Sequence, residues 1–152
     1  MVKLNKDATD QYEVTHKAKA LVLSCIDYRF IDHTTNLLQL GPLNMKYDFT
    51  ALPGSSLSFN QRKFKCWRTT FLETVKLAIQ LHHIGEIVVI DHMDCGAYAL
   101  LYPHIKMNSE EEKNLHIKNI NKFIKRMRKF FPKLKYTGYL LDIDGKVEQI
   151  II

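Results

Sequence analysis

Two short segments of the chain are continuously apolar and end in polar residues. The first is Lys19–Cys25 (KALVLSC), and the second is Glu86–His92 (EIVVIDH). An unbroken apolar run of this length is typical of a parallel strand that is covered on both faces of its sheet. We therefore predict two buried parallel strands whose carboxyl ends carry chemically capable side chains.

Three further segments have the composition of strands. Tyr47–Leu52 stops at Pro53–Gly54, and Tyr136–Asp142 is followed by Asp144–Gly145 and then by residues 147–152 (VEQIII). An Asp-Gly pair between two apolar runs favours a tight turn. The last two strands are therefore expected to form an antiparallel hairpin.

Helical patterns lie between the predicted strands, over Thr34–Leu40, Arg62–His83 and Glu110–Phe131. In the third helix, apolar residues recur at helical spacing and form one face, which we expect to pack on the sheet. They are Ile120, Phe123, Ile124, Met127, Phe130 and Phe131. Ser109 before this helix is a suitable N-cap, and Pro132 ends it.

The alternation of strands and helices predicts an α/β fold with right-handed crossovers into a mainly parallel sheet. We expect four parallel strands, one C-terminal antiparallel strand, and helices on both faces. The 152 residues are enough for one domain, residues 1–152, with residues 1–18 as an N-terminal arm. In such sheets ligands bind at the carboxyl ends of the strands.

The cysteine count favours metal or catalytic chemistry over disulfides. The chain has an odd number of cysteines, namely Cys25, Cys66 and Cys95. Since the chain shows neither a secretory signal nor a run of about 20 apolar residues, we predict a cytoplasmic protein with free or metal-bound thiols. Cys66, beside Trp67 in a helical stretch, is interpreted as a packing residue.

The net charge of +6 arises in one segment. Residues 113–135 contain nine basic residues and no acidic one, whereas the remainder holds thirteen basic and sixteen acidic residues. The basic side chains fall on the polar face of the third predicted helix and match its dipole at the C-terminal end. We interpret them as a solvated face and predict no nucleic-acid or membrane partner. A nucleic-acid or anionic-membrane patch over Lys118–Lys135 is the alternative reading of this segment.

The polar residues at the two buried strand ends fit one metal site. His92 and Cys95 are three apart where the chain leaves its strand, and Cys25 ends the other strand. If the two strands are parallel neighbours, these three side chains enclose one ion, and imidazole with two thiolates suits zinc. Three protein ligands leave the fourth tetrahedral position open, which is typical of a catalytic zinc site.

Asp27 and Arg29 are the expected outer partners of that site. Arg29 would hold Asp27 ionised and away from the metal, and Asp27 would then orient a water molecule. If the extended path persists beyond Cys25, alternation places all three side chains on one side. Asp94, inside the second motif, is interpreted as a cap of the helix that follows.

The motifs Cys-x-Asp-x-Arg at Cys25, Asp27 and Arg29, and His-x-x-Cys-Gly at His92, Cys95 and Gly96, resemble those of the β-class carbonic anhydrases. The closing stretch YTGYLLDIDGKVEQI also resembles that family's final hairpin, so the likeness runs from about Lys19 to the C-terminus. The resemblance implies a sheet in the order 2-1-3-4 with an added antiparallel strand, and homodimers or higher oligomers with active sites at the subunit boundary.

The resemblance also implies a function. Cys25, His92 and Cys95 would bind Zn²⁺, Asp27 and Arg29 would form the gating and orienting catalytic pair, and a zinc-bound hydroxide would hydrate carbon dioxide to bicarbonate. Two positions depart from the family pattern: Tyr28 replaces a serine, and ALPGSS (residues 51–56) replaces Arg-Asn-Ala-Gly. Two alternatives stay open: a zinc hydrolase of carbonyl sulfide or carbon disulfide, and a zinc-binding protein without turnover.

Overall fold

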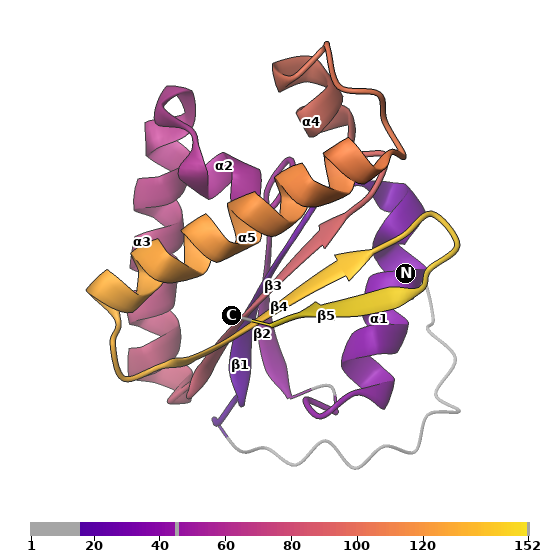
Figure 1. Ribbon diagram of the computed structural model, residues 1–152. Helices are drawn as coiled ribbons and strands as arrows, with labels where there is room; N and C mark the ends of the chain where they lie inside the picture. The colour runs from indigo at the N-terminus through magenta and orange to yellow at the C-terminus, as the bar shows by residue number, and fades with distance from the viewer. Residues whose placement is uncertain (1–15, 45, 152) are drawn as a thin grey trace, which may run out of the picture.

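A five-stranded sheet in the order β2-β1-β3-β4-β5 forms the centre of the protein (Figure 1). The computed structural model describes residues 16–44 and 46–151. The first four strands are parallel, and β5 pairs antiparallel with β4. The strands are β1 (Ala20–Ser24), β2 (Tyr47–Ala51), β3 (Glu86–His92), β4 (Lys135–Leu141) and β5 (Val147–Ile150).

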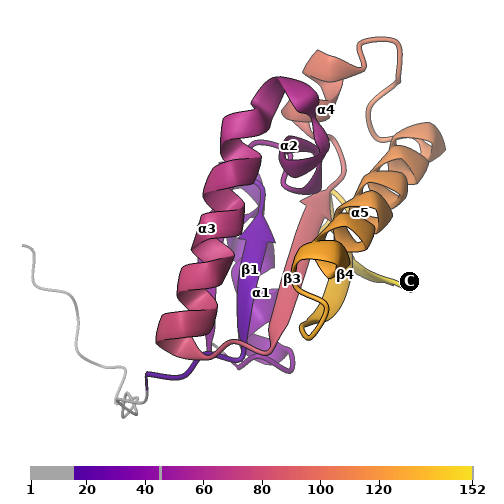
Figure 2. The same cartoon turned by 90° about the vertical axis from the view of Figure 1, so that its left-hand side faces the viewer.

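Helices cover both faces of this sheet (Figures 1 and 2). Side chains of α2, α3 and α5 share one core cluster with the sheet, and α1 covers the other face. The helices are α1 (Ile31–Leu40), α2 (Ser56–Asn60), α3 (Lys65–His82), α4 (Gly96–Leu101) and α5 (Glu110–Phe130), with short 3-10 turns at Tyr28–Phe30 and Arg62–Phe64.

The buried strand β1 shows why the sequence pattern predicts this fold. Successive side chains of a strand point to opposite faces. Leu21 and Leu23 therefore pack in the cluster under α3 and α5, while Ala20 and Val22 pack in the cluster under α1. Since both faces are covered, every residue of β1 is buried. The segment therefore lacks the alternation of apolar and polar residues that a strand with one exposed face would show.

The fold class, the strand order and the C-terminal hairpin are as predicted. The predicted helix over Arg62–His83 is divided, because a 3-10 turn precedes α3. The short helices α2 and α4 were not predicted. Phe130 is 54% exposed, so its assignment to the apolar face of α5 is wrong. Of the predicted N-terminal arm, residues 1–15 lie outside the described residues.

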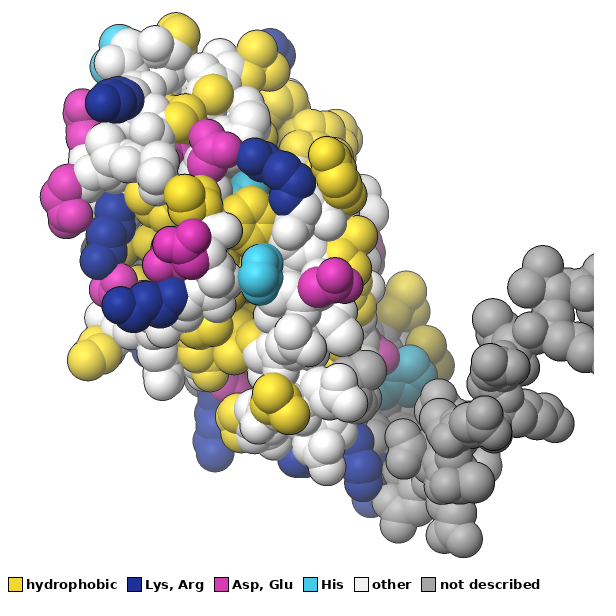
Figure 3. All heavy atoms as spheres, turned by 90° about the vertical axis from the view of Figure 1, so that its right-hand side faces the viewer, with side chains coloured by type: hydrophobic (Ala, Val, Ile, Leu, Met, Phe, Trp, Pro, Cys, Tyr) yellow, Lys and Arg dark blue, Asp and Glu magenta, His cyan; other side chains and the backbone are white. Residues whose placement is uncertain are grey.

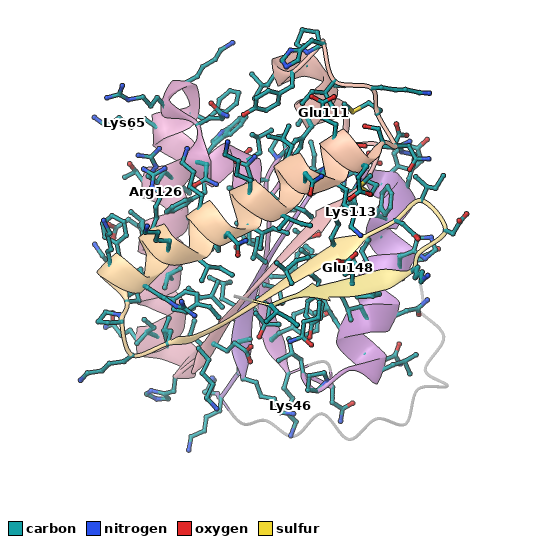
Figure 4. The ribbon with its side chains drawn as sticks, viewed as in Figure 1. Lys46, Lys65, Glu111, Lys113, Arg126 and Glu148 are labelled. Atoms are coloured by element: carbon teal, nitrogen blue, oxygen red, sulfur yellow. The ribbon has the colours of Figure 1, made fainter. Side chains whose placement is uncertain are left out.

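An ion pair on the surface connects α5 to the edge of the sheet. Lys113 Nζ lies 2.7 Å from Glu148 Oε2 of β5, and both side chains are visible in Figure 4. On the side that carries α1 and the β4–β5 turn, acidic, basic and hydrophobic side chains are interspersed (Figure 3). Within residues 16–44 and 46–151, the helices lack the combination of length and apolar character that a membrane span requires.

Candidate metal centre

Three side chains converge where β1 and β3 end. Sγ of Cys25, a ring nitrogen of His92 and Sγ of Cys95 all lie within 4.8 Å of one another. Cys25 follows β1, His92 is the last residue of β3, and Cys95 is the N-cap of α4. Because β1 and β3 are parallel neighbours, their carboxyl ends meet at one edge, as the sequence predicts.

The His92 ring is fixed so that one nitrogen faces this cluster. Its Nδ1–H donates to the carbonyl of Met93 at 2.8 Å, and the ring of Phe30 stacks on it with 4.0 Å between centroids. Nε2 is buried and has no hydrogen-bond partner among the described residues. A buried acceptor without a partner is rare and requires an explanation. A metal ion coordinated by Nε2 supplies one, since ligating histidines characteristically donate their other N–H.

The two thiols of the cluster differ in acidity because each changes the pKa of the other in opposite directions. The hydrogen bond from the Cys95 thiol lowers the pKa of Cys25 to about 4; burial opposes this shift, while the imidazole of His92 and the N–H of Gly54 favour it. The interaction with Cys25, together with burial, raises the pKa of Cys95. The cluster therefore already stabilises one thiolate, which is the form that binds metals.

Gly54 supports the thiolate through its backbone. Its N–H donates to Sγ of Cys25 at 3.2 Å. Gly54 has a φ of +71°, and a Cβ atom there would lie 3.0 Å from the Cβ of Ala97. The turn therefore needs a glycine for two reasons, a left-handed backbone and close packing against α4. This position is the part of the ALPGSS segment that matches the family pattern.

Asp27 and Arg29 form a bidentate pair next to the cluster. Arg29 donates from Nε to Oδ1 of Asp27 at 3.0 Å and from Nη2 to Oδ2 at 2.8 Å. These hydrogen bonds lower the pKa of Asp27, although partial burial opposes the shift. Oδ2 of Asp27 lies 3.9 Å from Nε2 of His92, so an ionised carboxylate lies near the unpartnered nitrogen of the imidazole.

The extended path assumed for this segment is wrong. β1 ends at Ser24, and Tyr28–Phe30 forms a 3-10 turn. Asp27 caps that turn by accepting the backbone N–H of Arg29 at 3.1 Å. The two side chains meet because the turn brings them together, and strand alternation is not the cause.

Asp94 is a second partner of Arg29. Arg29 donates from Nη1 to Oδ2 of Asp94 and from Nη2 to its carbonyl oxygen, both at 2.8 Å. The interpretation of Asp94 as a helix cap is wrong, because the N-cap of α4 is Cys95 and has no side-chain cap bond. Arg29 thus connects the turn after β1 to the turn after β3.

Tyr28 lies mostly in solvent, with 80% of its surface exposed. We therefore expect Tyr28→Ser to leave metal content unchanged and to shift the free energy of unfolding by no more than about 0.5 kcal/mol, as for other surface substitutions. Metal analysis and urea denaturation test this. A loss of metal in this variant would show that the phenol ring supports the cluster.

A buried polar network behind the cluster escaped the sequence analysis. Asp91, adjacent to His92, accepts from Ser56 Oγ at 2.7 Å, from Tyr98 at 2.8 Å and from His116 Nδ1 at 3.0 Å. Nε2 of His116 lies 3.4 Å from Glu112. These side chains are buried. The sequence signal was present but weak: Glu112 and His116 stand four apart on the buried face of α5, which is mostly apolar.

The fold and the candidate site together indicate the class of protein to which the chain belongs. This is an α/β protein with a parallel sheet, a Cys₂His cluster at its carboxyl edge, and an Asp–Arg pair beside the cluster. A sequence model of the family described as "Putative carbonic anhydrase" matches residues 15–151. The chain belongs to this family, as a divergent member with the β-carbonic anhydrase fold.

Two relatives, both described as uncharacterized proteins, match most of the chain. The chain is 34% identical to a protein of Rickettsia conorii, over 94% of this chain and 77% of the relative. It is also 34% identical to a protein of Rickettsia bellii, over 93% and 87% of the two chains. These similarities extend across nearly the whole described chain.

Solved β-carbonic anhydrases share the fold at low sequence identity. A tetrameric enzyme of Sordaria macrospora superposes with a TM-score of 0.58 at 16% identity, covering 89% of this chain and 81% of that one. A Trichomonas vaginalis enzyme gives a TM-score of 0.58 at 17% identity, covering 99% and 87%.

Proposed function

We propose that this protein is a zinc-dependent carbonic anhydrase that hydrates carbon dioxide to bicarbonate. One observation carries the proposal: His92, whose buried Nε2 has no hydrogen-bond partner among the described residues, lies beside two cysteine sulfurs and an ionised carboxylate. Cys25, His92 and Cys95 would hold the zinc. Membership of the carbonic anhydrase family supports the same reaction.

The residues around the cluster are suited to handling a water molecule and its proton. When bound, zinc supplies Lewis acidity that lowers the pKa of a water molecule toward about 7. Arg29 keeps Asp27 ionised, so its carboxylate can accept a hydrogen bond from a water molecule in the site. Because both carboxylate oxygens are hydrogen-bonded to Arg29, Asp27 is also restrained from moving onto the metal.

The proposal is tested by metal analysis of the native protein together with stopped-flow carbon dioxide hydration across pH. We expect about one zinc ion per chain and hydration well above the buffer rate. A native protein without metal would overturn the proposal. Stoichiometric zinc without hydration at any pH would instead support the alternative of a zinc-binding protein without turnover, in which chelation mainly lowers stability.

Replacement of Asp27 separates metal binding from turnover. Asp27→Asn is expected to keep zinc and to lower the hydration rate about 100-fold, within the range for loss of a proton-handling group. Asp32→Asn is the matched control, because Asp32 is an exposed carboxylate in the first turn of α1. Zinc loss in the Asp27 variant would contradict this division of roles.

A related reaction is the second candidate. Tyr28 and the residues around Gly54 in the ALPGSS segment depart from the family pattern near the cluster. We propose that these changes alter which small electrophile the site accepts. Parallel assays with carbon dioxide, carbonyl sulfide and carbon disulfide on the same zinc-loaded sample distinguish the candidates by their relative kcat/KM.

The proposal includes assembly and location. We propose a homodimer or higher oligomer in the cytoplasm. Ile26, Tyr28 and Ile31, which follow Cys25 in the chain, have 60%, 80% and 58% of their surfaces exposed. The Sordaria macrospora neighbour is tetrameric. Sedimentation velocity measures the assembly directly.

A further inference from the structure

One buried carboxylate reaches the backbone of the turn that carries Cys95. Glu112 of α5 is 0% exposed. Its Oε2 accepts the N–H of Asp94 at 3.1 Å, and its Oε1 accepts the N–H of Cys95, also at 3.1 Å. Oε2 accepts in addition the N–H of Asn108 at 2.5 Å. A single side chain therefore holds two successive amides of the Met93–Cys95 turn.

That turn needs external support because its backbone is unfavourable. Asp94 has a φ of +55°, a left-handed conformation that costs a non-glycine residue roughly 1 kcal/mol or more. Such a conformation persists where surrounding contacts determine it. Glu112 supplies two of these contacts from inside the protein, and Arg29 supplies two from the surface.

The turn positions groups on both sides of the candidate centre. Cys95 contributes one of the three cluster atoms, and Asp94 contributes the carboxylate and carbonyl that bind Arg29. Arg29 in turn holds Asp27. A displacement of the turn would consequently move a metal ligand and loosen the Asp–Arg pair together.

Glu112 is itself held by the buried network. Nε2 of His116, one helical turn further along α5, lies 3.4 Å from Oε1 of Glu112, and Nδ1 lies 3.0 Å from Asp91. Asp91 immediately precedes His92 in β3. The network thus spans from the strand end that carries His92 to the turn that carries Cys95, and it fixes their separation.

We propose that Glu112 is a positioning residue of the metal centre, which holds the Met93–Cys95 turn in the geometry that metal binding requires. This inference rests on the proposed metal-binding function. Glu112 itself contributes no ligand; it acts through the two backbone amides of the turn, and His116 fixes its carboxylate.

A simpler role for Glu112 would be that of an acid in the first turn of α5, where the helix dipole favours negative charge. Glu110 and Glu111 occupy the same turn and are exposed. Glu112 differs from them because it is buried and accepts N–H groups from outside the helix. Glu111, labelled in Figure 4, is therefore a matched control for the dipole effect.

The experiment compares Glu112→Gln with Glu111→Gln in the zinc-loaded full chain. Both variants lose one charge from the same helical turn, but a glutamine at position 112 offers one acceptor oxygen where the amides of Asp94, Cys95 and Asn108 need acceptors. We expect zinc affinity, measured by chelator competition, to fall 10- to 100-fold for Glu112→Gln and to stay within 2-fold for Glu111→Gln.

Two further readouts separate positioning from simple destabilisation. Cobalt substituted for zinc should show altered d–d and thiolate charge-transfer bands in Glu112→Gln, and the amides of Asp94 and Cys95 should exchange hydrogen faster. If Glu112→Gln does not fold, the same measurements on Glu112→Asp and Glu111→Asp test the positioning role. The aspartate keeps the charge but has a shorter reach, so weaker zinc binding and a changed cobalt spectrum are expected.

The outcomes distinguish this inference from the proposed function. Native zinc affinity and an unchanged cobalt spectrum in the folded position-112 variant would overturn the positioning role and leave the metal centre intact. A native protein that binds no zinc would overturn both. An equal loss of affinity in the position-111 control would assign the effect to helix charge and would also overturn the positioning role.

Discussion

A Cys95→Ser protein is expected to lose its zinc and with it any hydration above the buffer rate. A serine hydroxyl replaces the thiolate that completes the Cys₂His cluster. Even the loss of an outer partner of a metal ligand lowers affinity 10- to 100-fold, so removal of a ligand should lower zinc affinity by more than about 100-fold. Metal analysis after dialysis and stopped-flow hydration measure the two effects.

The chain offers a matched cysteine for this experiment. Cys66 on α3 is exposed, and it does not belong to the metal-type cluster found among the described residues. Cys66→Ser removes the same chemical group elsewhere on the surface and is expected to keep both zinc and activity. Full zinc retention in the Cys95 variant, or equal loss in the Cys66 variant, would contradict the assignment of the ligands.

His116→Gln is expected to lower the free energy of unfolding by about 3–5 kcal/mol, the usual cost of breaking a buried ion pair by removing one partner. His116 lies between Asp91 and Glu112, and all three side chains are buried. Burial lowers the pKa of His116, but the hydrogen bonds and charges of the two carboxylates outweigh it and raise the pKa. A neutral glutamine leaves two buried carboxylates without their cation.

A surface pair provides the control. His82 Nδ1 lies 2.8 Å from Asp48, a comparable histidine–carboxylate contact, but the two side chains are 40% and 25% exposed. Exposed ion pairs contribute about 0–1 kcal/mol, so His82→Gln should have a small effect. Urea denaturation of both variants in the same zinc-containing buffer measures the difference. Equal effects would show that the buried network contributes no more than a solvated pair.

The sign of the pH dependence follows from the raised pKa of His116. A group that binds its proton more tightly in the folded state contributes its full stability below the unfolded pKa of about 6.5. That contribution is lost as the pH rises through the folded pKa. The stability difference between native protein and His116→Gln should therefore be largest at pH 6 and should decrease toward pH 9.

The sequence predicts the sheet and the cluster because their signals are local. The runs Lys19–Cys25 and Glu86–His92 are unbroken and apolar, so both strands are recognised without knowledge of their neighbours. The spacing of His92 and Cys95 at a strand end is a local chelate pattern, and parallel pairing brings Cys25 to it. The role assigned to these residues remains a prediction that metal analysis must test.

The features missed by the sequence analysis depend on contacts between distant segments. Asp94 faces Arg29, and Glu112 faces the turn after β3; nothing in the neighbouring residues specifies either partner. Cys66 was interpreted as a packing residue, but it is exposed, because local helical spacing does not show which part of a helix face the rest of the fold covers. For the buried network, the sequence signal is a carboxylate four residues before a histidine on a mostly apolar helix face, as at Glu112 and His116.

The cluster joins two chain segments that are separated by α1, β2, α2 and α3. Helices form from local contacts, whereas parallel pairing of β1 with β3 requires closure of the long intervening loop, and such non-local contacts are slow to form. Cys25 reaches His92 and Cys95 only after that pairing. We therefore expect metal capture to be a late event in folding, and a bound ion to slow unfolding without accelerating folding.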